Sequence, residues 1–399
     1  MRILIAEDER ISRMTLLRQL QSWGHDVTAA EDGEQAWERF NSGEFEIIIT
    51  DWEMPRLLGV ELVRRIRALP QSVYCYIIIL TSRSDKSDIV AGIEAGADDF
   101  VSKPFDREEL RVRLLAGERI INLERTLKRQ NAELRDANER IHLGLRAAAR
   151  VQQSMLPRHN IETPQVSTGF SYIPTDELAG DAIGLHLIDD RFLAAYVLDV
   201  SGHGVPAALL SVSAMHSLEP IPPEVSLLRT VTPNGSELGT VQRPARVAAE
   251  LNRRFRAGEN DGRFLTMILC VLDTLNGSLH LTRAGHPQAL LLRNDQSIPI
   301  PDCGGLPIAI IDGGDYDECS VQLQRGDRIC LFSDGIIEQT DACDAEQFGD
   351  SRLLNALVAA RSATAPDSAR EIVNTLTAWS GNRAFTDDVS LVIIDWLGS

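Results

Sequence analysis

The chain has 399 residues, a formal net charge of −18 and a sequence pI of about 4.9. Its length suggests two or three domains, and its acidic balance argues against nucleic acid or an anionic membrane as a partner. We find no signal peptide and no apolar run long enough to span a bilayer, and the six cysteines show no CxxC spacing. We therefore expect a cytoplasmic protein with reduced thiols.

The first part of the chain alternates short apolar strands with helical stretches. Residues 2–9 (RILIAEDE) form a strand that ends on acids, and residues 46–55 form another that ends on Asp51. The strand within residues 74–82 ends on Thr81, and the following one leads to Lys103. Strands that close on functional side chains and alternate with helices predict a doubly wound parallel sheet with its ligand site at the carboxyl ends of the strands.

These blocks resemble the response-regulator receiver domain over about residues 1–115, which implies an α/β fold with a five-stranded parallel sheet. The resemblance implies that Glu7 and Asp8 hold Mg²⁺ together with Asp51 and the backbone carbonyl of Glu53. It also implies that Asp51 takes a phosphoryl group from a sensor histidine kinase or a phosphotransfer protein. The alternative is that Asp51 is a strand-end residue that caps the following loop, but Asp8, Thr81 and Lys103 are all in place, which favours the phosphorylation site.

The same resemblance assigns a switch to the remaining positions of the receiver-like segment. Lys103 would pair with the phosphoryl oxygens, and the peptide bond before Pro104 is expected to be cis. Thr81 would move to bind the phosphoryl group while Phe100 swings inward, a change that the added charge would drive. Leu58 stands where the family commonly has an acid.

Residues 117–155 carry apolar side chains at a seven-residue period, which predicts a long helix. The stripe contains Ile120, Leu127, Leu134, Ile141, Ala148 and Met155, with Leu123, Ala137 and Val151 between them and Gln130 and Gly144 as interruptions. It indicates either a parallel two-stranded coiled coil or a lone helix packed on its own domains. We favour the homodimer, because an isolated helix has nothing else to bury this stripe. The helix would reach about 50 Å.

Four aspartates are spread over the C-terminal half, each at the end of an apolar run or in a glycine-flanked turn. They are Asp181, Asp199, Asp334 and Asp387. Any one of them alone is more often a turn former or a helix cap. Together they offer the oxygen ligands that Mg²⁺ and Mn²⁺ prefer, and two such ions about 3.5–4 Å apart can bind a phosphate and activate a water. The pattern predicts a binuclear metal site.

Residues 147–395 resemble the SpoIIE-like bacterial branch of the PPM, or metal-dependent, serine/threonine phosphatases. The resemblance implies an α/β/β/α sandwich. It runs through blocks at residues 149–157, 179–181, 199–210, 264–273, 284–292, 304–310, 326–338 and 387–394.

The phosphatase resemblance also implies roles for individual residues. Asp181 and Asp199 would share two Mn²⁺ or Mg²⁺ ions with the backbone carbonyl of Val200, and Asp334 and Asp387 would complete the coordination of the second ion.

Several neighbours of these acids keep alternative interpretations. Asp388 is either a supporting acid or an alternative ligand to Asp387. Gly202 permits close backbone approach, and His203 either orients water or phosphate or makes a structural hydrogen bond, as does His286. Residues 182–184 depart from the family pattern at the expected substrate lip. Residues 217–244 form either a partner-binding flap or a disordered insert.

The expected domains are a receiver at residues 1–116, a coiled-coil linker at 117–155 and a phosphatase domain at 156–399. The main hypothesis is a response regulator whose phosphorylation controls dephosphorylation of phosphoserine or phosphothreonine. The resemblance to the phosphatase family suggests a phosphorylated anti-sigma factor antagonist in a partner-switching pathway as the substrate. The alternatives are a non-enzymatic sigma-factor adaptor and a hydrolase of small phosphate esters.

Overall fold

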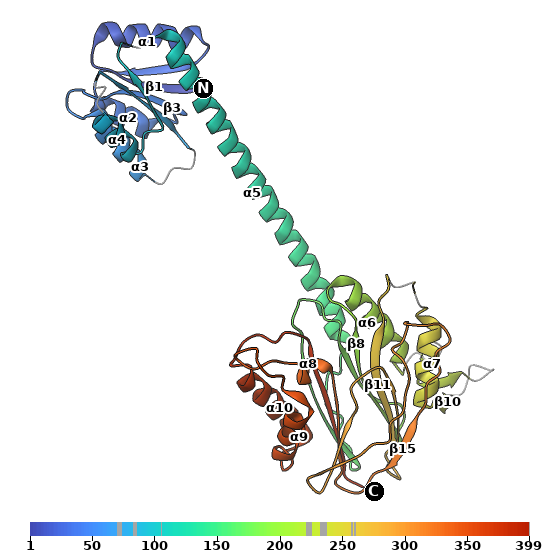
Figure 1. The fold of residues 1–399 in the computed structure, drawn as a ribbon. Helices are drawn as coiled ribbons and strands as arrows, with labels where there is room; N and C mark the ends of the chain where they lie inside the picture. The colour runs from blue at the N-terminus through green and yellow to red at the C-terminus, as the bar shows by residue number, and fades with distance from the viewer. Residues whose placement is uncertain are drawn as a thin grey trace. The chain divides into compact units, whose positions relative to one another are not determined.

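The computed structural model describes residues 1–69, 74–82, 86–104, 106–220, 226–231, 238–256, 258 and 261–398. The chain divides into two compact units, Met1–Glu139 and Arg140–Ser399, and helix α5 (Arg107–Met155) runs from the first into the second (Figure 1). Within the described ranges, no helix is both long and apolar enough to cross a membrane.

The first unit is built on a parallel sheet with the strand order β2-β1-β3-β4-β5. Its order reverses between β1 and β3, which places the switch point of a doubly wound sheet there. The strands are β1 (Arg2–Ala6), β2 (Asp26–Ala30), β3 (Ile47–Asp51), β4 (Tyr76–Thr81) and β5 (Asp99–Ser102). The helices are α1 (Arg10–Ser22), α2 (Gly33–Ser42), α3 (Gly59–Ala68), α4 (Lys86–Glu94) and the start of α5.

Both faces of this sheet are buried. Along β1, Ile3 and Ile5 pack with residues of α1 and α5, whereas Leu4 and Ala6 pack with residues of α2 and α3. Successive side chains point to opposite faces of a strand, so an uninterrupted apolar run suits a strand covered by helices on both sides. The predicted doubly wound sheet is confirmed.

Helix α5 has 49 residues. Its first turns belong to the first unit, where Leu110, Leu114 and Ile121 are buried against the sheet. Much of the predicted stripe is exposed instead, with Leu123 at 70% and Leu134 at 68%. The expected domain boundary at residue 116 falls inside this continuous helix.

The second unit contains two antiparallel five-stranded sheets, ordered β15-β12-β11-β8-β7 and β14-β13-β16-β17-β6. The strands of the first are β7 (Ala182–Leu187), β8 (Phe192–Val200), β11 (Leu265–Asp273), β12 (Ser278–Ala284) and β15 (Cys319–Gln322). The strands of the second are β6 (Val166–Ile173), β13 (Leu290–Arg293), β14 (Gln296–Ile298), β16 (Arg328–Phe332) and β17 (Val389–Trp396). The helices are α6 (Val205–Leu218), α7 (Pro244–Arg254), α8 (Asp334–Ile337), α9 (Gly349–Ala359) and α10 (Ala365–Trp379).

Alternation along the strands arranges this unit in four layers. On β8, Leu193 and Val197 face the other sheet, while Leu198 faces α6 and α7. On β17, Val392 faces β8's sheet and Ile393 faces α9 and α10. Figure 1 shows α6 and α7 on one side of the paired sheets and α9 and α10 on the other. The predicted α/β/β/α sandwich is confirmed.

The segment 217–244 begins where α6 ends. The described part holds a short antiparallel hairpin of β9 (Arg229–Val231) and β10 (Leu238–Val241), which precedes α7. Residues 221–225 and 232–237 lie outside the described residues, so the choice between a flap and a disordered insert stays open there.

A buried arginine ties the second sheet to its helices. The guanidinium of Arg328 on β16 donates to both carboxylate oxygens of Asp395 on β17, at 2.7 and 2.8 Å. It also donates to Ser368 Oγ at 2.6 Å and to the backbone carbonyls of residues 360 and 363 at 3.0 and 2.9 Å. Since β16 leads into Asp334 and β17 follows Asp387, this contact fixes the strands that deliver two of the acids.

We expect Arg328→Met to lower the free energy of unfolding by about 3–5 kcal/mol, because it leaves the Asp395 carboxylate, which is 13% exposed, without its arginine partner. Urea denaturation of the full chain measures the change. The matched control is Arg370→Met, which removes an exposed pair with Asp367 and should cost under about 0.5 kcal/mol. Equal losses for the two variants would contradict this role of Arg328.

Candidate functional site

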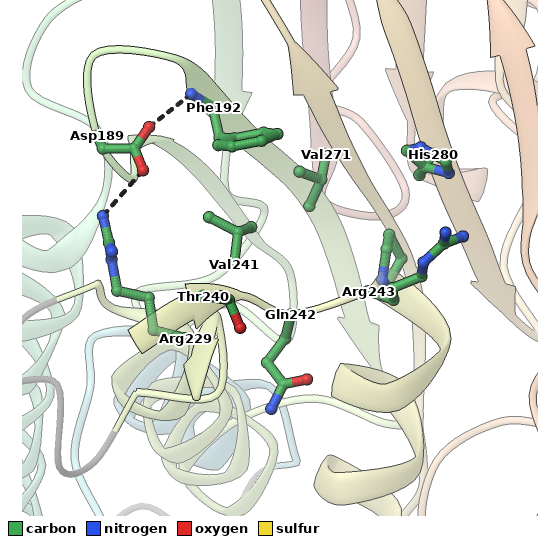
Figure 2. Close-up of a pocket in the computed structure, with 10 residues that line it drawn as sticks. Asp189, Phe192, Arg229, Thr240, Val241, Gln242, Arg243, Val271 and His280 are labelled. Atoms are coloured by element: carbon green, nitrogen blue, oxygen red, sulfur yellow. Dashed lines mark hydrogen bonds and ion pairs between the residues drawn. The ribbon is translucent and has the colours of Figure 1, made fainter. Parts of the chain in front are cut away.

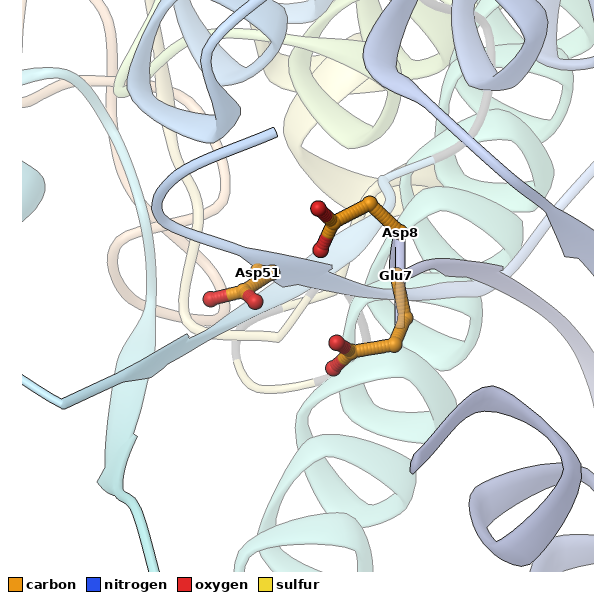
Figure 3. Close-up of side chains that lie close together, drawn as sticks. All are labelled: Glu7, Asp8 and Asp51. Atoms are coloured by element: carbon orange, nitrogen blue, oxygen red, sulfur yellow. The ribbon is translucent and has the colours of Figure 1, made fainter. Parts of the chain in front are cut away.

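Three acids meet at the switch point of the first unit. Glu7 and Asp8 follow β1 and Asp51 ends β3, so neighbouring parallel strands deliver them to one edge of the sheet (Figure 3). One carboxylate oxygen from each lies within 4.8 Å of the other two. The side chain of Glu7 is buried and its Oε1 has no hydrogen-bond partner. Oxygen ligands at this spacing fit a hard divalent cation such as Mg²⁺.

Lys103 adds an ammonium to the same edge. Its Nζ donates to Glu7 Oε2 and to Asp51 Oδ2, both at 2.7 Å. Burial opposes the charge of Lys103, but the hydrogen bonds to Asp51 and Glu7 outweigh it and raise the pKa of the lysine. Burial raises the pKa of Glu7, although the Lys103 hydrogen bond opposes the shift.

The other receiver positions lie around this group. Thr81 ends β4 and is buried, and its carbonyl accepts a hydrogen bond of 2.6 Å from the backbone N–H of Lys103. Phe100 is half-buried on β5, and Glu53 lies in the bend after β3. The peptide bond between Lys103 and Pro104 is cis, as expected. A Cβ on Gly59 would lie 1.9 Å from the carbonyl oxygen of Asp51, so only glycine fits beside that strand end.

The four aspartates of the second unit come from both of its sheets. Asp181 precedes β7 and Asp199 lies near the end of the adjacent β8, whereas Asp334 follows β16 and Asp387 leads into β17. A cavity of about 500 Å³ opens beside them, with Asp199, Val200 and Asp387 among its lining residues. Folding therefore gathers acids that lie more than 200 positions apart in the sequence.

Burial makes these carboxylates reluctant to ionise together. Burial, followed by the charges of Asp334 and Asp387, raises the pKa of Asp199 to about 7. Burial and the neighbouring Asp199 raise the pKa of Asp181, which is 2% exposed and whose Oδ2 has no hydrogen-bond partner among the described residues. Burial also raises the pKa values of Asp334 and Asp387. No arginine or lysine is among the described residues that line the cavity, so bound cations fit the charge that the protein leaves unbalanced.

The spread of the acids differs between the two sites. Among the described residues, Glu7, Asp8 and Asp51 form the only group of three or more acids, histidines or cysteines whose ligand atoms all lie within 4.8 Å of one another. The aspartates of the second unit are spaced more widely, which suits two ions better than one.

The neighbouring acids Asp387 and Asp388 face different surroundings. Asp388 Oδ1 accepts hydrogen bonds from the backbone N–H and the hydroxyl of Thr175, at 2.8 and 3.0 Å. Its Oδ2 accepts from the backbone N–H groups of Gly180 and Asp181, at 3.0 and 3.4 Å. Asp387 instead lines the cavity. This geometry supports Asp387 as the ligand and Asp388 as the acid that holds the loop carrying Asp181.

The turn after β8 lies against the same cavity. Gly202 and Gly204 have φ angles of +86° and +79°, which side-chain-bearing residues rarely adopt. His203 between them is 91% exposed and lies 3.9 Å from Asp176.

His286, by contrast, is buried: its Nδ1 lies 2.8 Å from Thr266 Oγ1 and its Nε2 lies 3.1 Å from the carbonyl oxygen of Phe332.

These contacts make His286 a structural tie. Burial lowers the pKa of His286 to about 3, so the ring is neutral at physiological pH. It joins β11, where Thr266 pairs with Asp199, to the end of β16 just before Asp334. Of the two interpretations of this histidine, the structural hydrogen bond is the one the geometry supports.

The expected lip at residues 182–184 is wrong. These residues lie inside β7, where Ala182 and Ile183 are fully buried. A Cβ on Gly184 would lie 2.1 Å from the ring of Tyr196, so this position accommodates the tyrosine rather than a substrate. Thr175, Asp176, Phe385 and Thr386 stand at the cavity instead.

Sequence patterns missed one further residue beside the acids. Gln152, near the end of α5, is buried and exchanges two hydrogen bonds with the backbone of Ala179, at 2.7 and 3.2 Å. Ala179 lies two residues before Asp181. The available signal was a polar residue on the inward face of an amphipathic helix end, beside the buried Ala149.

A second cavity, of about 620 Å³, lies away from the acids, at the start of β8 (Figure 2). Arg229 and Arg243 border it, but they pair with Asp189 and with Glu318 respectively. Although it is larger, it offers no group of unbalanced charges, so we place the candidate chemistry at the acidic cavity.

We expect the affinity of the second unit for Mn²⁺ to decrease as the pH is lowered. The Asp199 carboxyl, with its pKa of about 7, must lose its proton before it can bind a cation. Affinity should be about tenfold weaker at pH 6 than at pH 8. Calorimetric titration of the full-length Asp51→Asn variant, which weakens the site in the first unit, provides the measurement. Equal affinity at the two pH values would contradict the assignment of Asp199 as a ligand.

Comparisons with known proteins agree with this division. Residues 189–397 match the family model of Stage II sporulation protein E (SpoIIE), and residues 3–115 match that of the response regulator receiver domain. Response regulator MprA of Mycobacterium avium is 40% identical over 116 residues, which cover 29% of this chain and 50% of MprA. MprA of Mycobacterium ulcerans is 41% identical over 123 residues, covering 31% and 52%. The chain thus spans about half the length of these relatives.

A solved structure resembles the second unit. The SiaA-PP2C domain of Pseudomonas aeruginosa superposes with a TM-score of 0.51 at 21% identity, covering 65% of this chain and 98% of that domain. At this identity the likeness shows the fold. Because the SpoIIE match covers more than half of the chain, the protein belongs to the SpoIIE family, with a PP2C-type phosphatase domain that follows an N-terminal response-regulator receiver domain.

Proposed function

We propose that this protein is a metal-dependent serine/threonine protein phosphatase whose activity is controlled by phosphorylation of Asp51. One observation carries the proposal: four aspartates beside a cavity have raised pKa values, and no arginine or lysine is among the described residues that line that cavity. A structural cluster of acids would be stabilised by arginine or lysine, as Asp395 is by Arg328.

Asp181, Asp199, Asp334, Asp387 and the carbonyl of Val200 would hold two Mn²⁺ or Mg²⁺ ions. When bound, such ions neutralise charge on the phosphoryl oxygens and lower the pKa of water. The backbone at Gly202 and the side chain of His203 would also contribute. Gly202 lets the backbone approach closely, and the exposed His203 can donate a hydrogen bond to a phosphate at the rim.

Control would begin at the receiver site. A sensor histidine kinase or a phosphotransfer protein would place a phosphoryl group on Asp51, with Mg²⁺ held by Glu7, Asp8, Asp51 and the Glu53 carbonyl. The ammonium of Lys103, which already contacts Asp51, can pair with the new oxygens. Thr81 and Phe100 would then rearrange the surface of β4 and β5.

Helix α5 supplies a physical route to the second site. Gln152 grips the backbone of Ala179, and the following Gly180 and Asp181 are held by Asp388. A rotation or shift of α5 would therefore pull directly on the segment that positions Asp181. The hydrogen bonds between Gln152 and Ala179 support a mechanism in which movement of α5 changes the position of Asp181. They do not favour one in which α5 acts on substrate binding.

We propose a phosphorylated anti-sigma factor antagonist as the substrate. The SpoIIE family match supports a phosphoprotein, and the exposed rim around His203 suits a protein segment better than an enclosed small molecule. The alternative of a small phosphate ester hydrolase predicts turnover of nucleotides or sugar phosphates. The alternative of a non-enzymatic adaptor predicts none.

We expect Asp334→Ala to lower phosphatase activity by about 10²–10³-fold, because it removes a cation ligand, and to leave beryllofluoride binding at Asp51 intact. Asp51→Ala should abolish the response to beryllofluoride and keep the basal rate. The assay measures phosphate release from the phosphorylated antagonist with Mn²⁺, with and without beryllofluoride.

The outcomes separate the hypotheses. Loss of basal turnover in Asp51→Ala would contradict the division into two sites. An absence of hydrolysis of every phosphoprotein and aryl phosphate, together with normal signalling by Asp199→Asn, would favour the adaptor.

We also propose that α5 forms a parallel coiled coil in a homodimer. We expect the double variant Leu127→Lys/Leu134→Lys to become monomeric, because it puts charges into the exposed apolar stripe. Light scattering after size exclusion measures the mass. Ala132→Lys, at another exposed position on this helix, is the control and should stay dimeric. A monomeric parent chain would contradict the coiled coil.

A further inference from the structure

Two cysteine side chains meet outside both sites. Cys303 lies in the loop after β14, and Cys319 is the first residue of the edge strand β15. Their Sγ atoms are 2.7 Å apart, which is closer than two sulfur atoms lie in ordinary van der Waals contact, whereas a disulfide bond is about 2.05 Å long. Cys303 is 9% exposed and Cys319 is half-buried.

The backbone holds this pair together independently of its side chains. Cys319 pairs with Leu281 across the β12–β15 ladder, and Cys303 Sγ lies 3.5 Å from the carbonyl oxygen of the same Leu281. Two residues after Cys303, Gly305 N donates to the carbonyl of Arg283 at 2.7 Å. Two residues before Cys319, residue 317 N donates to the carbonyl of residue 304 at 3.2 Å, so the loop stays bound near both cysteines. Both cysteines are therefore anchored to β12, and bond formation needs no rearrangement of the chain.

We propose that Cys303 and Cys319 are a modification site: they form a reversible intramolecular disulfide when the protein meets a hydroperoxide. The more exposed Cys319, as its thiolate, attacks the peroxide oxygen, which gives a sulfenic acid and, from hydrogen peroxide, one water after protonation. Cys303 then attacks that sulfur, the Sγ–Sγ bond forms, and the sulfenic oxygen leaves as a second water. Two thiols lose two electrons and two protons, and one peroxide is reduced to two waters.

The surroundings set the speed of this step. Burial and the neighbouring Cys303 raise the pKa of Cys319 to about 12, so little thiolate is present at neutral pH and the reaction is slow. The pair thus responds to sustained oxidation rather than to brief exposure. Once formed, the bond is shielded on the Cys303 side, which slows its reduction by small thiols.

The disulfide between Cys303 and Cys319 would stabilise the edge strand β15. Strand β15 is the last in its sheet and pairs only with β12 in the described residues, and an edge strand is a weak point of a sheet. The loop that carries Cys303 continues to Ile308, which exchanges backbone hydrogen bonds of 3.0 and 2.8 Å with Leu265 at the start of β11. Closing this loop constrains the unfolded chain and so stabilises the folded unit.

The test uses the full-length chain in a Cys343→Ser background, because Cys343 is exposed and could form bonds between molecules. Samples reduced with dithiothreitol or oxidised with hydrogen peroxide are alkylated, digested and examined by mass spectrometry. We expect the oxidised sample to contain a Cys303–Cys319 linked peptide that dithiothreitol removes. We also expect the oxidised protein to melt about 5–10 °C higher, and Cys319→Ala to show no such shift.

Two results would overturn the proposal. One is equal alkylation of Cys303 and Cys319 in reduced and oxidised protein. The other is oxidation of either residue to sulfinic acid without a linked peptide, which would show that the sulfurs do not meet. Because the mass measurement is made with both cysteines present, it does not depend on the folding of the Cys319→Ala variant.

Discussion

The carboxylate of Asp388 accepts hydrogen bonds from the backbone of Gly180 and Asp181 and from Thr175. Through these bonds the start of β17, in one sheet, holds the loop that leads into β7, in the other. Asp181 and Asp387 are thereby brought to the same end of the sandwich. Because these acids repel one another once buried, hydrogen bonds of this kind are needed to keep them there, and each ion bound between them would add to the same attachment.

The two acidic sites differ in whether a positively charged side chain offsets the repulsion between their carboxylates. In the receiver unit, the ammonium of Lys103 sits between Glu7 and Asp51 and offsets part of their charge. In the phosphatase unit, burial and mutual repulsion raise the pKa values of the aspartates, and the described residues that line the cavity include no arginine or lysine. The receiver site is therefore partly preorganised by its own side chains, whereas the aspartates of the phosphatase unit have no such ammonium among the described residues that line their cavity.

Sequence patterns predicted the fold, and they singled out acids that the structure places at strand ends, because the motif residues follow or precede apolar runs. Asp51, Asp199 and Asp334 follow apolar runs, and such runs predict strands whose ends are fixed by the sheet. The prediction of a substrate lip at residues 182–184 was wrong for a physical reason. These residues belong to the strand β7, and Gly184 makes room for the ring of Tyr196. A departure from a family motif can reflect packing with a neighbouring strand, which no local pattern reveals.

The sequence by itself determined the two fold classes, the identity of the acids and the long helix, since periodicity and motif spacing are local properties of the chain. Only the tertiary structure decided that Asp388 holds a loop while Asp387 lines the cavity, that Gln152 grips the segment beside Asp181, that His286 is a buried tie, and that Cys303 meets Cys319. Each of these depends on contacts between elements far apart in sequence, and such contacts are fixed by how the sheets and helices pack.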